Sequence, residues 1–310
     1  MAVPQVSIIS PVYGAEKIID ELVKQIIVNI NPLVTDFEII LIDDCGPDES
    51  WLKIVDHCKK HPFVKGIKLS RNFGQHSAIT AGIDYATGTY LIIMDCDLQD
   101  DPKYFKQLLV KASEGYDIVY TVKTSRKHPF VKNISAKLFN YIFNLLTNNS
   151  NIKSNTNIGS YSLISRKVAE AFKNINDYHR HYLMVLRWLG FNSSYIEIEH
   201  KERFIGKSGY TLTKLIKHGI DGITSQSDRL LRIFIGIGLL ISSISFLSII
   251  LIITLYFVNG FQSGWASMVI LILFSTGIIL TGIGILGIYT GKIFEQTKNR
   301  PKYLVDKILN

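Results

Sequence analysis

The chain has 310 residues, of which 47% are hydrophobic and 19% are charged, and its formal net charge is +8. This length allows one large or two small domains with a buried core. The positive charge does not indicate a nucleic-acid partner, because no recognised nucleic-acid-binding module is present and the basic residues cluster beside two long apolar runs. Attraction to anionic lipid head groups explains the charge better, and we expect no nucleic-acid binding.

The N-terminal part of the chain alternates between apolar strands and helical patterns. Near-continuous apolar strands separated by helices are typical of a parallel sheet covered by helices on both faces. The sequence therefore predicts an α/β fold with a mainly parallel sheet. The predicted strands are Val6–Pro11, Phe37–Ile42, Val64–Leu69, Tyr90–Met94, Tyr161–Ser165 and Ser194–Ile198.

Polar residues follow the first four of these strands, at the point where each strand ends. In sheets of this kind, ligands bind beyond the carboxyl ends of the strands. Four strand ends that carry polar residues indicate a shared ligand site more strongly than any single motif does. These residues are Pro11-Val12-Tyr13, Asp43-Asp44, Arg71-Asn72 and the pair Asp95 and Asp97.

Asp95 and Asp97 are separated by one residue and directly follow the apolar run Tyr90–Met94. Side chains alternate along a strand, so the two carboxylates are expected to point the same way. Two carboxylates at the edge of a buried sheet are costly unless a positive partner joins them, and a divalent ion that carries a phosphorylated ligand meets this need. The alternative is that Asp97 or Asp101 only caps the helix that begins at Pro102, and a proline at the first helical position favours Asp101 as that cap.

Two apolar runs, Leu231–Val258 and Trp265–Tyr289, occupy the C-terminal part of the chain, and no Asp, Glu, Lys or Arg occurs between Ile233 and Gly291. Each run exceeds the ~20 residues that a helix needs to cross a bilayer, so we expect two transmembrane helices rather than a buried helical hairpin. Basic residues lie before the first run and after the second. By the positive-inside rule, both termini and the domain before residue 230 face the cytoplasm.

The motifs, their order and spacing, and the apolar hairpin resemble the family 2 polyprenyl-phosphate glycosyltransferases, which include dolichyl-phosphate mannose synthase and bacterial undecaprenyl-phosphate glucosyltransferases. The resemblance covers nearly the whole chain. It implies a GT-A fold, Rossmann-like with a mainly parallel sheet and helices on both faces, followed by a transmembrane hairpin. The matching motifs are Pro11-Val12-Tyr13, Ile42-Asp43-Asp44, Leu69–Gly74, Met94–Asp100, Leu163–Lys167, Arg203–Ser208 and Asp221–Ser225.

The resemblance implies roles for individual residues. Asp95 and Asp97 would hold Mg²⁺ or Mn²⁺ on the diphosphate of a nucleotide-sugar. Arg203, Lys207 and Ser208 would belong to a loop that closes over the donor and acceptor phosphates, and together with Asp97 they are the expected catalytic residues. The expected contacts to the nucleotide-sugar are Pro11, Tyr13, Glu16, Asp43, Asp44, Arg71, Asn72, Asp95 and Gln99, with Asp44 favoured over Asp43.

Three positions depart from the usual motifs of this family. Gly14-Ala15-Glu16 stands where an asparagine and a glutamate usually follow Tyr13, so the nucleotide-contacting acid is missing or shifted to Glu16. Ser160 occupies a place where many relatives carry an aspartate, so no general base is carried over to it. In the closing loop a glycine follows Ser208 where a lysine is usual, and Lys207 is expected to supply the charge.

A missing base is compatible with a phosphate acceptor, because a monophosphate with a second pKa near ~6 is already mostly an oxyanion at neutral pH. The predicted reaction is therefore inverting, metal-dependent transfer of a sugar from a nucleotide-sugar, with UDP-hexose favoured, to polyprenyl (undecaprenyl) phosphate. The metal would offset charge on the leaving diphosphate, and Arg203 would screen the incoming phosphate.

The same resemblance implies the organisation and the partners. Residues 1–205 would form a cytoplasmic catalytic domain, 206–230 an acceptor loop and an amphipathic juxtamembrane helix, 231–292 two transmembrane helices, and 293–310 a basic cytoplasmic tail. The protein would lie in the inner (plasma) membrane as a multi-pass protein. Expected partners are the nucleotide-sugar donor, the lipid acceptor, the bilayer, a downstream flippase and transferase, and further copies of the chain in a homo-oligomer.

Three alternative functions stay open from the sequence. A transferase that acts on a sugar hydroxyl of a lipid-diphosphate glycan would need a general base. A processive polysaccharide synthase of the same superfamily would carry a Gln-x-x-Arg-Trp motif, but Met184–Trp188 lacks the glutamine, and two spans are too few for a polymer pore. A catalytically inactive membrane partner that only binds nucleotide-sugar is disfavoured by the intact pair Asp95 and Asp97.

Overall fold

The computed structural model of the chain describes residues 5–124, 158–177, 180–199 and 264–310, together with isolated positions between 231 and 254. The chain divides into two compact units, the first formed by residues 1–132, 153–209 and 300–310, and the second by residues 133–152 and 210–299. The loop that contains Arg203, Lys207 and Ser208 lies outside the described residues, as does the predicted juxtamembrane helix.

The first unit is an α/β domain, and its strands lie close to those that the apolar runs predict. Its described elements are, in chain order, β1 (Val6–Val12), α1 (Ile19–Ile30), β2 (Phe37–Asp43), α2 (Ser50–Lys60), β3 (Val64–Leu69), α3 (Gln75–Tyr85), β4 (Tyr90–Ile93), the 3₁₀ helix η1 (Pro102–Tyr104), α4 (Phe105–Ser113), β5 (Ile118–Thr124), β6 (Ile158–Ser165), α6 (Arg166–Lys173), α7 (Tyr182–Leu189), β7 (Ser193–Glu199) and β8 (Val305–Leu309).

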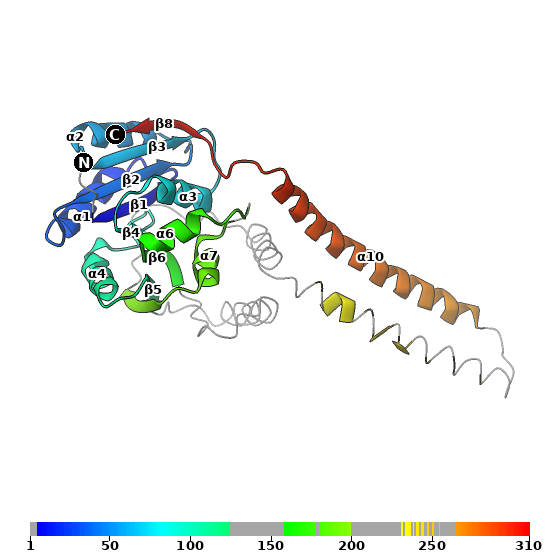
Figure 1. Cartoon of the computed structure of the whole chain (residues 1–310). Coiled ribbons are helices and arrows are strands. Elements are labelled where there is room, and N and C mark those ends of the chain that lie inside the picture. The colour runs from blue at the N-terminus through cyan, green and yellow to red at the C-terminus, as the bar shows by residue number, and fades with distance from the viewer. Residues whose placement is uncertain are drawn as a thin grey trace. The chain divides into compact units, whose positions relative to one another are not determined.

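The described strands form one sheet in the order β7-β5-β6-β4-β1-β2-β3-β8 (Figure 1). Strands β3, β2, β1 and β4 are parallel to one another, so their carboxyl ends lie along one edge. Strand β6 runs antiparallel to both β4 and β5, which brings the first residues of β6 and the last residues of β5 to this same edge. The predicted parallel sheet is confirmed for its central strands, and β6 and β8 make the whole sheet mixed.

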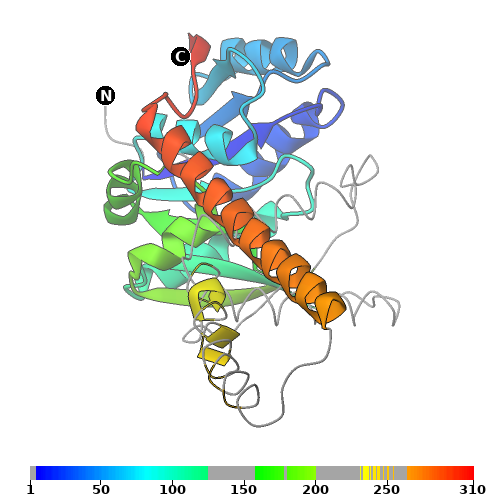
Figure 2. The ribbon, with the colours of Figure 1, turned by 90° about the vertical axis from the view of Figure 1, so that its right-hand side faces the viewer.

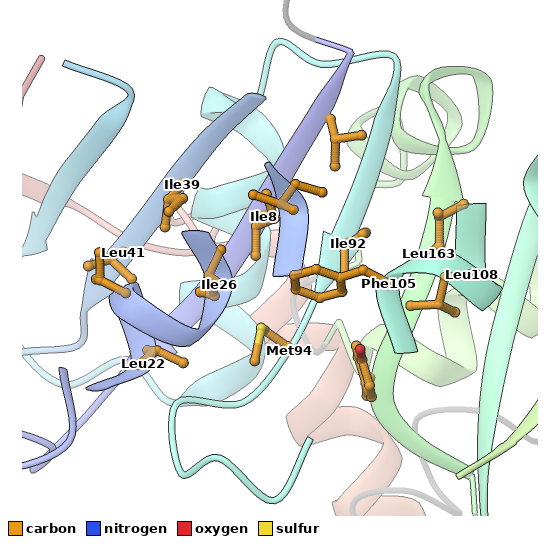
Figure 3. Packing of buried hydrophobic residues seen from close by; sticks show 14 of the residues in the cluster. Ile8, Leu22, Ile26, Ile39, Leu41, Ile92, Met94, Phe105, Leu108 and Leu163 are labelled. Carbon is orange, nitrogen blue, oxygen red and sulfur yellow. The ribbon is translucent and has the colours of Figure 1, made fainter. Parts of the chain in front are cut away.

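Helices cover both faces of the sheet, as the apolar strands predict. Residues of α1, α2 and α4 pack on one face, and residues of α3, α6 and α7 pack on the other. Because both faces are covered, the central strands β1, β2 and β4 are buried at nearly every position rather than at alternate positions. Figure 3 shows the packing on the first face, where side chains from four strands meet those of α1 and α4; the labelled residues are Ile8, Leu22, Ile26, Ile39, Leu41, Ile92, Met94, Phe105, Leu108 and Leu163.

The C-terminal segment belongs to the sheet and is not a free tail, which corrects the expectation for residues 293–310. Residues Val305–Leu309 form β8, which pairs antiparallel with β3 at the end of the sheet (Figures 1 and 2). The amide of Ser70 donates to the carbonyl oxygen of Leu304 at 2.9 Å, and the Tyr303 hydroxyl donates to Asp84 Oδ2 at 2.9 Å. The strand is short and carries charged residues, so the sequence shows basic character more clearly than strand character.

A buried carboxylate joins three neighbouring strands on the side of the sheet away from the polar strand ends. Oε1 of Glu38 accepts hydrogen bonds from the Ser7 hydroxyl at 2.6 Å and from the Thr87 amide at 2.7 Å. The Lys65 ammonium lies 2.7 Å from Oε2. Burial alone would raise the pKa of Glu38, but the Lys65 ammonium and the hydrogen bonds outweigh it and lower the pKa below its ordinary value.

Replacing Glu38 by glutamine is expected to lower the free energy of unfolding by about 2 kcal/mol at neutral pH, because hydrogen bonds to ionised groups contribute about 1.5–3 kcal/mol. The pKa of Glu38 is depressed from its ordinary 4.5, so this stabilisation is present above pH 4.5 and is lost as the pH falls through the folded-state pKa. Urea unfolding of the detergent-solubilised protein, followed by tryptophan fluorescence, should show the difference from wild type shrinking toward acid. A difference that does not change with pH would contradict the ion pair.

The second unit contains α10 (Trp265–Thr297), which is drawn as one continuous helix in Figures 1 and 2. Within the described part of the chain, the segment Phe274–Thr297 is long and apolar enough to cross a membrane, by length and composition. The first predicted span is described only at isolated helical positions. One of these, Phe234, packs its ring against the space that a side chain at Gly282 would occupy, so the two apolar segments approach closely at this glycine.

Candidate active site

The loop after β4 presents its acidic residues at the carboxyl edge of the sheet. Its shape is held by its own carboxylates, since Asp100 Oδ2 accepts from the amide of Asp95 at 3.1 Å and Asp97 Oδ1 accepts from the amide of Gln99 at 3.1 Å. Leu98 between them adopts a left-handed backbone with φ of +58°, which non-glycine residues rarely adopt. These two short bridges fold the loop back on itself and place Asp95 and Asp97 in one polar cluster.

The predicted cap at the start of the following helix is confirmed. Oδ1 of Asp101 accepts a hydrogen bond from the amide of Lys103 at 3.0 Å, at the beginning of η1, and Pro102 stands at the first helical position. The capping function therefore falls to Asp101 and leaves Asp97 outside it. This separation of roles removes the main structural alternative to a ligand-binding role for Asp97.

Two side chains from remote parts of the chain hold Asp95. Its Oδ1 accepts hydrogen bonds from Gln75 Nε2 at 2.7 Å and from Ser160 Oγ at 3.0 Å. Burial is the largest cause that raises the pKa of Asp95, the negative charges of Asp100 and Asp97 raise it further, and the result is about 7. Burial and the neighbouring carboxylates both disfavour the ionised form of this group, and a cation bound beside it would favour that form.

Asp100 is the structural member of this cluster. Its side chain is only 1% exposed, and the Lys123 ammonium at the end of β5 lies 3.2 Å from its Oδ1. Burial raises the pKa of Asp100, while Lys123 acts in the opposite direction. Gly159 stands beside this lysine, where a Cβ would be 3.4 Å from Lys123 Cε. One carboxylate oxygen of Asp100 pairs with the Lys123 ammonium, and the other accepts from the amide of Asp95. Asp100 therefore holds the loop in place.

Asp43 and Asp44 end β2, and both are buried. The two oxygens of Asp44 accept from the amides of Phe73 at 2.7 Å and Gly74 at 2.9 Å, so this carboxylate holds the turn between β3 and α3. Asp43 Oδ1 accepts from the amide of Gly46 at 3.3 Å. Burial is the main cause that raises the pKa of both groups. Contact of either residue with a nucleotide stays a prediction, and for Asp44 it would use lone pairs that these amides leave free.

The turn that Asp44 holds carries two exposed polar residues, Arg71 and Asn72. The guanidinium carbon of Arg71 lies 4.5 Å from the centre of the Phe73 ring, and Arg71 forms no ion pair within the described part of the chain. Among the described residues, no acid at the sheet edge therefore neutralises Arg71. Its charge faces solvent, where a phosphate group can reach it.

Pro11 and Tyr13 differ in their surroundings. Pro11 lies inside β1 and is buried, so it shapes the end of the strand and offers no exposed surface to a ligand. Tyr13 directly follows this strand, and its side chain is 54% exposed. A large aromatic side chain that is exposed at the carboxyl edge of the sheet is suited to packing against a flat ring of a ligand.

Glu16 points to a different place from the one that the sequence suggests. Its Oε2 accepts from the amide of Glu49 at 3.4 Å, and its own amide donates to Asp48 Oδ2 at 2.9 Å, so its carboxylate lies at the start of α2. A carboxylate is favourable at a helix N-terminus because it satisfies unpaired amides and the helix dipole. The departure at Gly14 has a backbone cause, since its φ of +63° is a conformation that glycine and asparagine adopt most readily.

The sequence places Asp95 and Asp97 correctly at the strand end, but it does not reveal Gln75 and Ser160, which donate to Asp95, or Lys123, which pairs with Asp100. Gln75 is the first residue of α3, Ser160 lies in β6, and Lys123 lies in β5, and only the sheet order brings them together. The signal for Ser160 was present, because it stands where relatives of the resembled family carry an acid. No local signal marks Gln75.

The cluster suits a divalent ion that shares its ligands with a substrate. Among the described residues, no group of three or more His, Cys, Asp or Glu side chains could hold a metal, so a site made entirely of protein ligands is not found there. Mg²⁺ and similar ions commonly take only one or two carboxylates plus the oxygens of phosphates and water. Asp95 and Asp97 lie in one cluster with the buried carboxylate of Asp100, and they fit this second type of site.

Residues 7–172 match the family model described as glycosyl transferase family 2. The chain belongs to this family. Its enzyme class is therefore that of a family 2 glycosyltransferase, and the match covers every described residue of the acidic cluster from Asp95 to Ser160.

Relatives of this family 2 glycosyltransferase are similar to it over nearly the whole chain. It is 34% identical to the uncharacterized glycosyltransferase YkcC of Bacillus subtilis, over 98% of this chain and 94% of that protein. It is 33% identical to the SfII prophage-derived bactoprenol glucosyl transferase of Shigella flexneri, over 98% of each. It is 31% identical to the prophage bactoprenol glucosyl transferase homolog of Escherichia coli, over 98% of this chain and 99% of that protein.

Solved structures agree on the fold. The glucosyl-3-phosphoglycerate synthase of Mycobacterium tuberculosis, solved with Mn²⁺ and UDP-glucose, is similar with a TM-score of 0.50 and 13% identity, covering 73% of this chain and 79% of that one. A further mycobacterial protein is similar with a TM-score of 0.50 and 15% identity, covering 73% of this chain and 74% of that one. The family 2 domain thus has the GT-A fold that the sequence predicts.

Proposed function

We propose that this family 2 glycosyltransferase transfers a hexosyl group from a nucleotide-sugar, with UDP-hexose favoured, to a polyprenyl phosphate. The observation that carries the proposal is the acidic cluster around Asp95 and Asp97, whose charge calls for a cation at the edge of the sheet where ligands bind. Two relatives named bactoprenol glucosyl transferases, 31–33% identical over 98% of the chain, support a polyprenyl acceptor.

Each exposed group at this edge has a task in the proposed reaction. Asp95 and Asp97 would hold Mg²⁺ or Mn²⁺, which supplies a Lewis acid and positive charge to the leaving diphosphate when bound. Arg71 would bind donor phosphate oxygens, since a guanidinium matches them in a bidentate fork. Tyr13 would pack against the nucleobase. Asp43, Asp44 and Gln99 would keep these groups in place.

The transfer itself is a direct displacement at the anomeric carbon. A phosphate oxygen of the acceptor forms the new bond to this carbon, the bond to the diphosphate oxygen breaks, and a nucleoside diphosphate leaves with its electron pair, so the configuration inverts. The acceptor is already anionic, so no side chain has to remove a proton. Arg203, Lys207 and Ser208 would screen the repulsion between the two phosphate groups, in the role that the resemblance implies for them.

The apolar segments determine where this reaction takes place. With Phe274–Thr297 and the first apolar run crossing the inner membrane, the catalytic unit would face the cytoplasm, where nucleotide-sugars are made available. The lipid-linked sugar would then require a flippase and a second transferase to use it. The uncharged loop between the two apolar runs is consistent with this orientation.

A donor panel tests the proposal. The purified full-length protein in lipid nanodiscs is incubated with undecaprenyl phosphate, Mn²⁺ or Mg²⁺, and labelled UDP-glucose, UDP-galactose, UDP-N-acetylglucosamine or GDP-mannose. We expect organic-extractable label from one donor, lost by at least about a hundredfold with a chelator and restored by excess metal. Transfer only to a lipid-diphosphate glycan, or no lipid-linked product with any donor, would contradict the proposal.

A further inference from the structure

Among the described residues, the side chains that donate to the Asp95 carboxylate are both neutral. Gln75 Nε2 and Ser160 Oγ both donate to Oδ1, and they lie 20 and 65 positions away in the chain. No donor among the described residues contacts Oδ2, and the residue is partly exposed. The ammonium of Lys123, which also lies in this cluster, pairs with Asp100 at 3.2 Å. The ammonium group of Lys123 therefore pairs with Asp100, whereas the neutral donors bind Asp95.

This arrangement has a physical consequence for ion binding. A carboxylate on a free side chain rotates about two torsions, and two hydrogen bonds to one oxygen fix both of them. Hydrogen bonds from neutral groups also favour the ionised carboxylate in a buried place. Unlike an ammonium, however, an amide and a hydroxyl add no positive charge that would repel an incoming cation. Oδ2 is left oriented and without a neighbouring positive charge that would repel an ion.

We propose that Gln75 and Ser160 are positioning residues that hold Asp95 Oδ1 so that Oδ2 receives the divalent ion, and that they thereby set the metal affinity of the site. The inference rests on the proposed function, which assigns the ion to Asp95 and Asp97. It adds that the first residue of α3 and a residue of β6 determine how tightly the ion binds. Outer partners of metal ligands typically change metal affinity by about 10–100-fold when removed.

The test is the binding of Mn²⁺ to the full-length protein, measured by electron paramagnetic resonance of the free ion, with and without UDP. Ser160→Ala and Gln75→Ala are each expected to weaken binding by about tenfold, and the double variant by up to about a hundredfold. Ser160→Thr keeps a hydroxyl and should bind close to the wild type. In transfer assays, the half-saturating Mn²⁺ concentration should rise, while kcat at saturating Mn²⁺ stays near that of the wild type.

Ser162→Ala is the matched control for a purely structural effect. Its hydroxyl lies on the same strand and bonds to the Ser160 carbonyl oxygen and the Tyr182 hydroxyl, with no contact to Asp95. This variant should lower the unfolding midpoint without changing Mn²⁺ affinity. Equal weakening by Ser162→Ala and Ser160→Ala would overturn the positioning role, as would wild-type affinity in the double variant or a wild type that binds no Mn²⁺ in either condition.

The outcomes for the two proposals are separable. If the variants bind Mn²⁺ more weakly but the wild type transfers no sugar to undecaprenyl phosphate, the positioning role stands and the proposed function fails. If the wild type transfers sugar and the variants bind Mn²⁺ as it does, the proposed function stands and the positioning role fails.

Discussion

Asp97→Asn is expected to lower kcat/KM for sugar transfer by about a hundredfold to a thousandfold, the loss typical of removing one preorganised electrostatic group from an active site. The amide oxygen of asparagine can still accept from the amide of Gln99, as Asp97 Oδ1 does at 3.1 Å. The loop should therefore keep its shape while it loses the negative charge that we propose binds the ion. Initial rates with saturating donor, at several Mn²⁺ concentrations, measure the effect.

Asp101→Asn is the matched control, since it makes the same chemical change four positions later. Asparagine is as good a helix cap as aspartate, so the hydrogen bond from the amide of Lys103 should survive. Activity and unfolding midpoint should stay within about twofold and 1 °C of the wild type, because a capping change of a few tenths of a kcal/mol moves the midpoint little. Full activity of Asp97→Asn would exclude the proposed role of this residue.

Lys123→Met is expected to destabilise the domain by about 4 kcal/mol, because removing one member of a buried ion pair leaves the other charge without compensation. Asp100 is 1% exposed, so water cannot replace the ammonium. Transfer activity should fall as well, since Asp100 anchors the amide of Asp95. Urea unfolding of the detergent-solubilised protein measures the stability change.

A second substitution separates the ion pair from the loss of the lysine side chain. In the Lys123→Met background, Asp100→Asn removes the unpaired charge and keeps an oxygen for the amide of Asp95. The double variant should be more stable than Lys123→Met alone, with a coupling energy of about 1–3 kcal/mol in the double-mutant cycle. Additive losses would show that the ion pair contributes nothing beyond its separate members.

The strands could be predicted from the sequence wherever helices cover both faces of the sheet. The strand Val64–Leu69 was predicted with the bounds that it has, because an apolar residue stands at each of its ends and is buried in the core on one face of the sheet or the other. The start of β6 was missed by three residues, from Ile158 to Ser160. These residues reach the polar edge of the sheet, so they no longer show the apolar pattern of a core strand.

The site could be predicted only where its residues follow a strand directly. Asp95 and Asp97 do so, and their pairing follows from local geometry alone. Lys123 carries no local signal of its role in the sequence, yet it is the ion-pair partner of buried Asp100. Glu16 accepts from the amide of Glu49 at the start of α2, a contact that its sequence position does not indicate, and its contact with a nucleotide stays a prediction. Such contacts depend on sheet order, which local patterns do not encode.

The position of β8 in the chain has a consequence for how the protein is made. During synthesis, β3 emerges from the ribosome long before β8, and the whole of α10 lies between them. Until residues 304–309 emerge, β3 is an open sheet edge, and the amide of Ser70 lacks the Leu304 carbonyl that it bonds in the finished protein. The turn that carries Arg71 therefore acquires its final support only after the apolar segments have been synthesised, which makes the last step of folding of this sheet edge depend on completion of the chain.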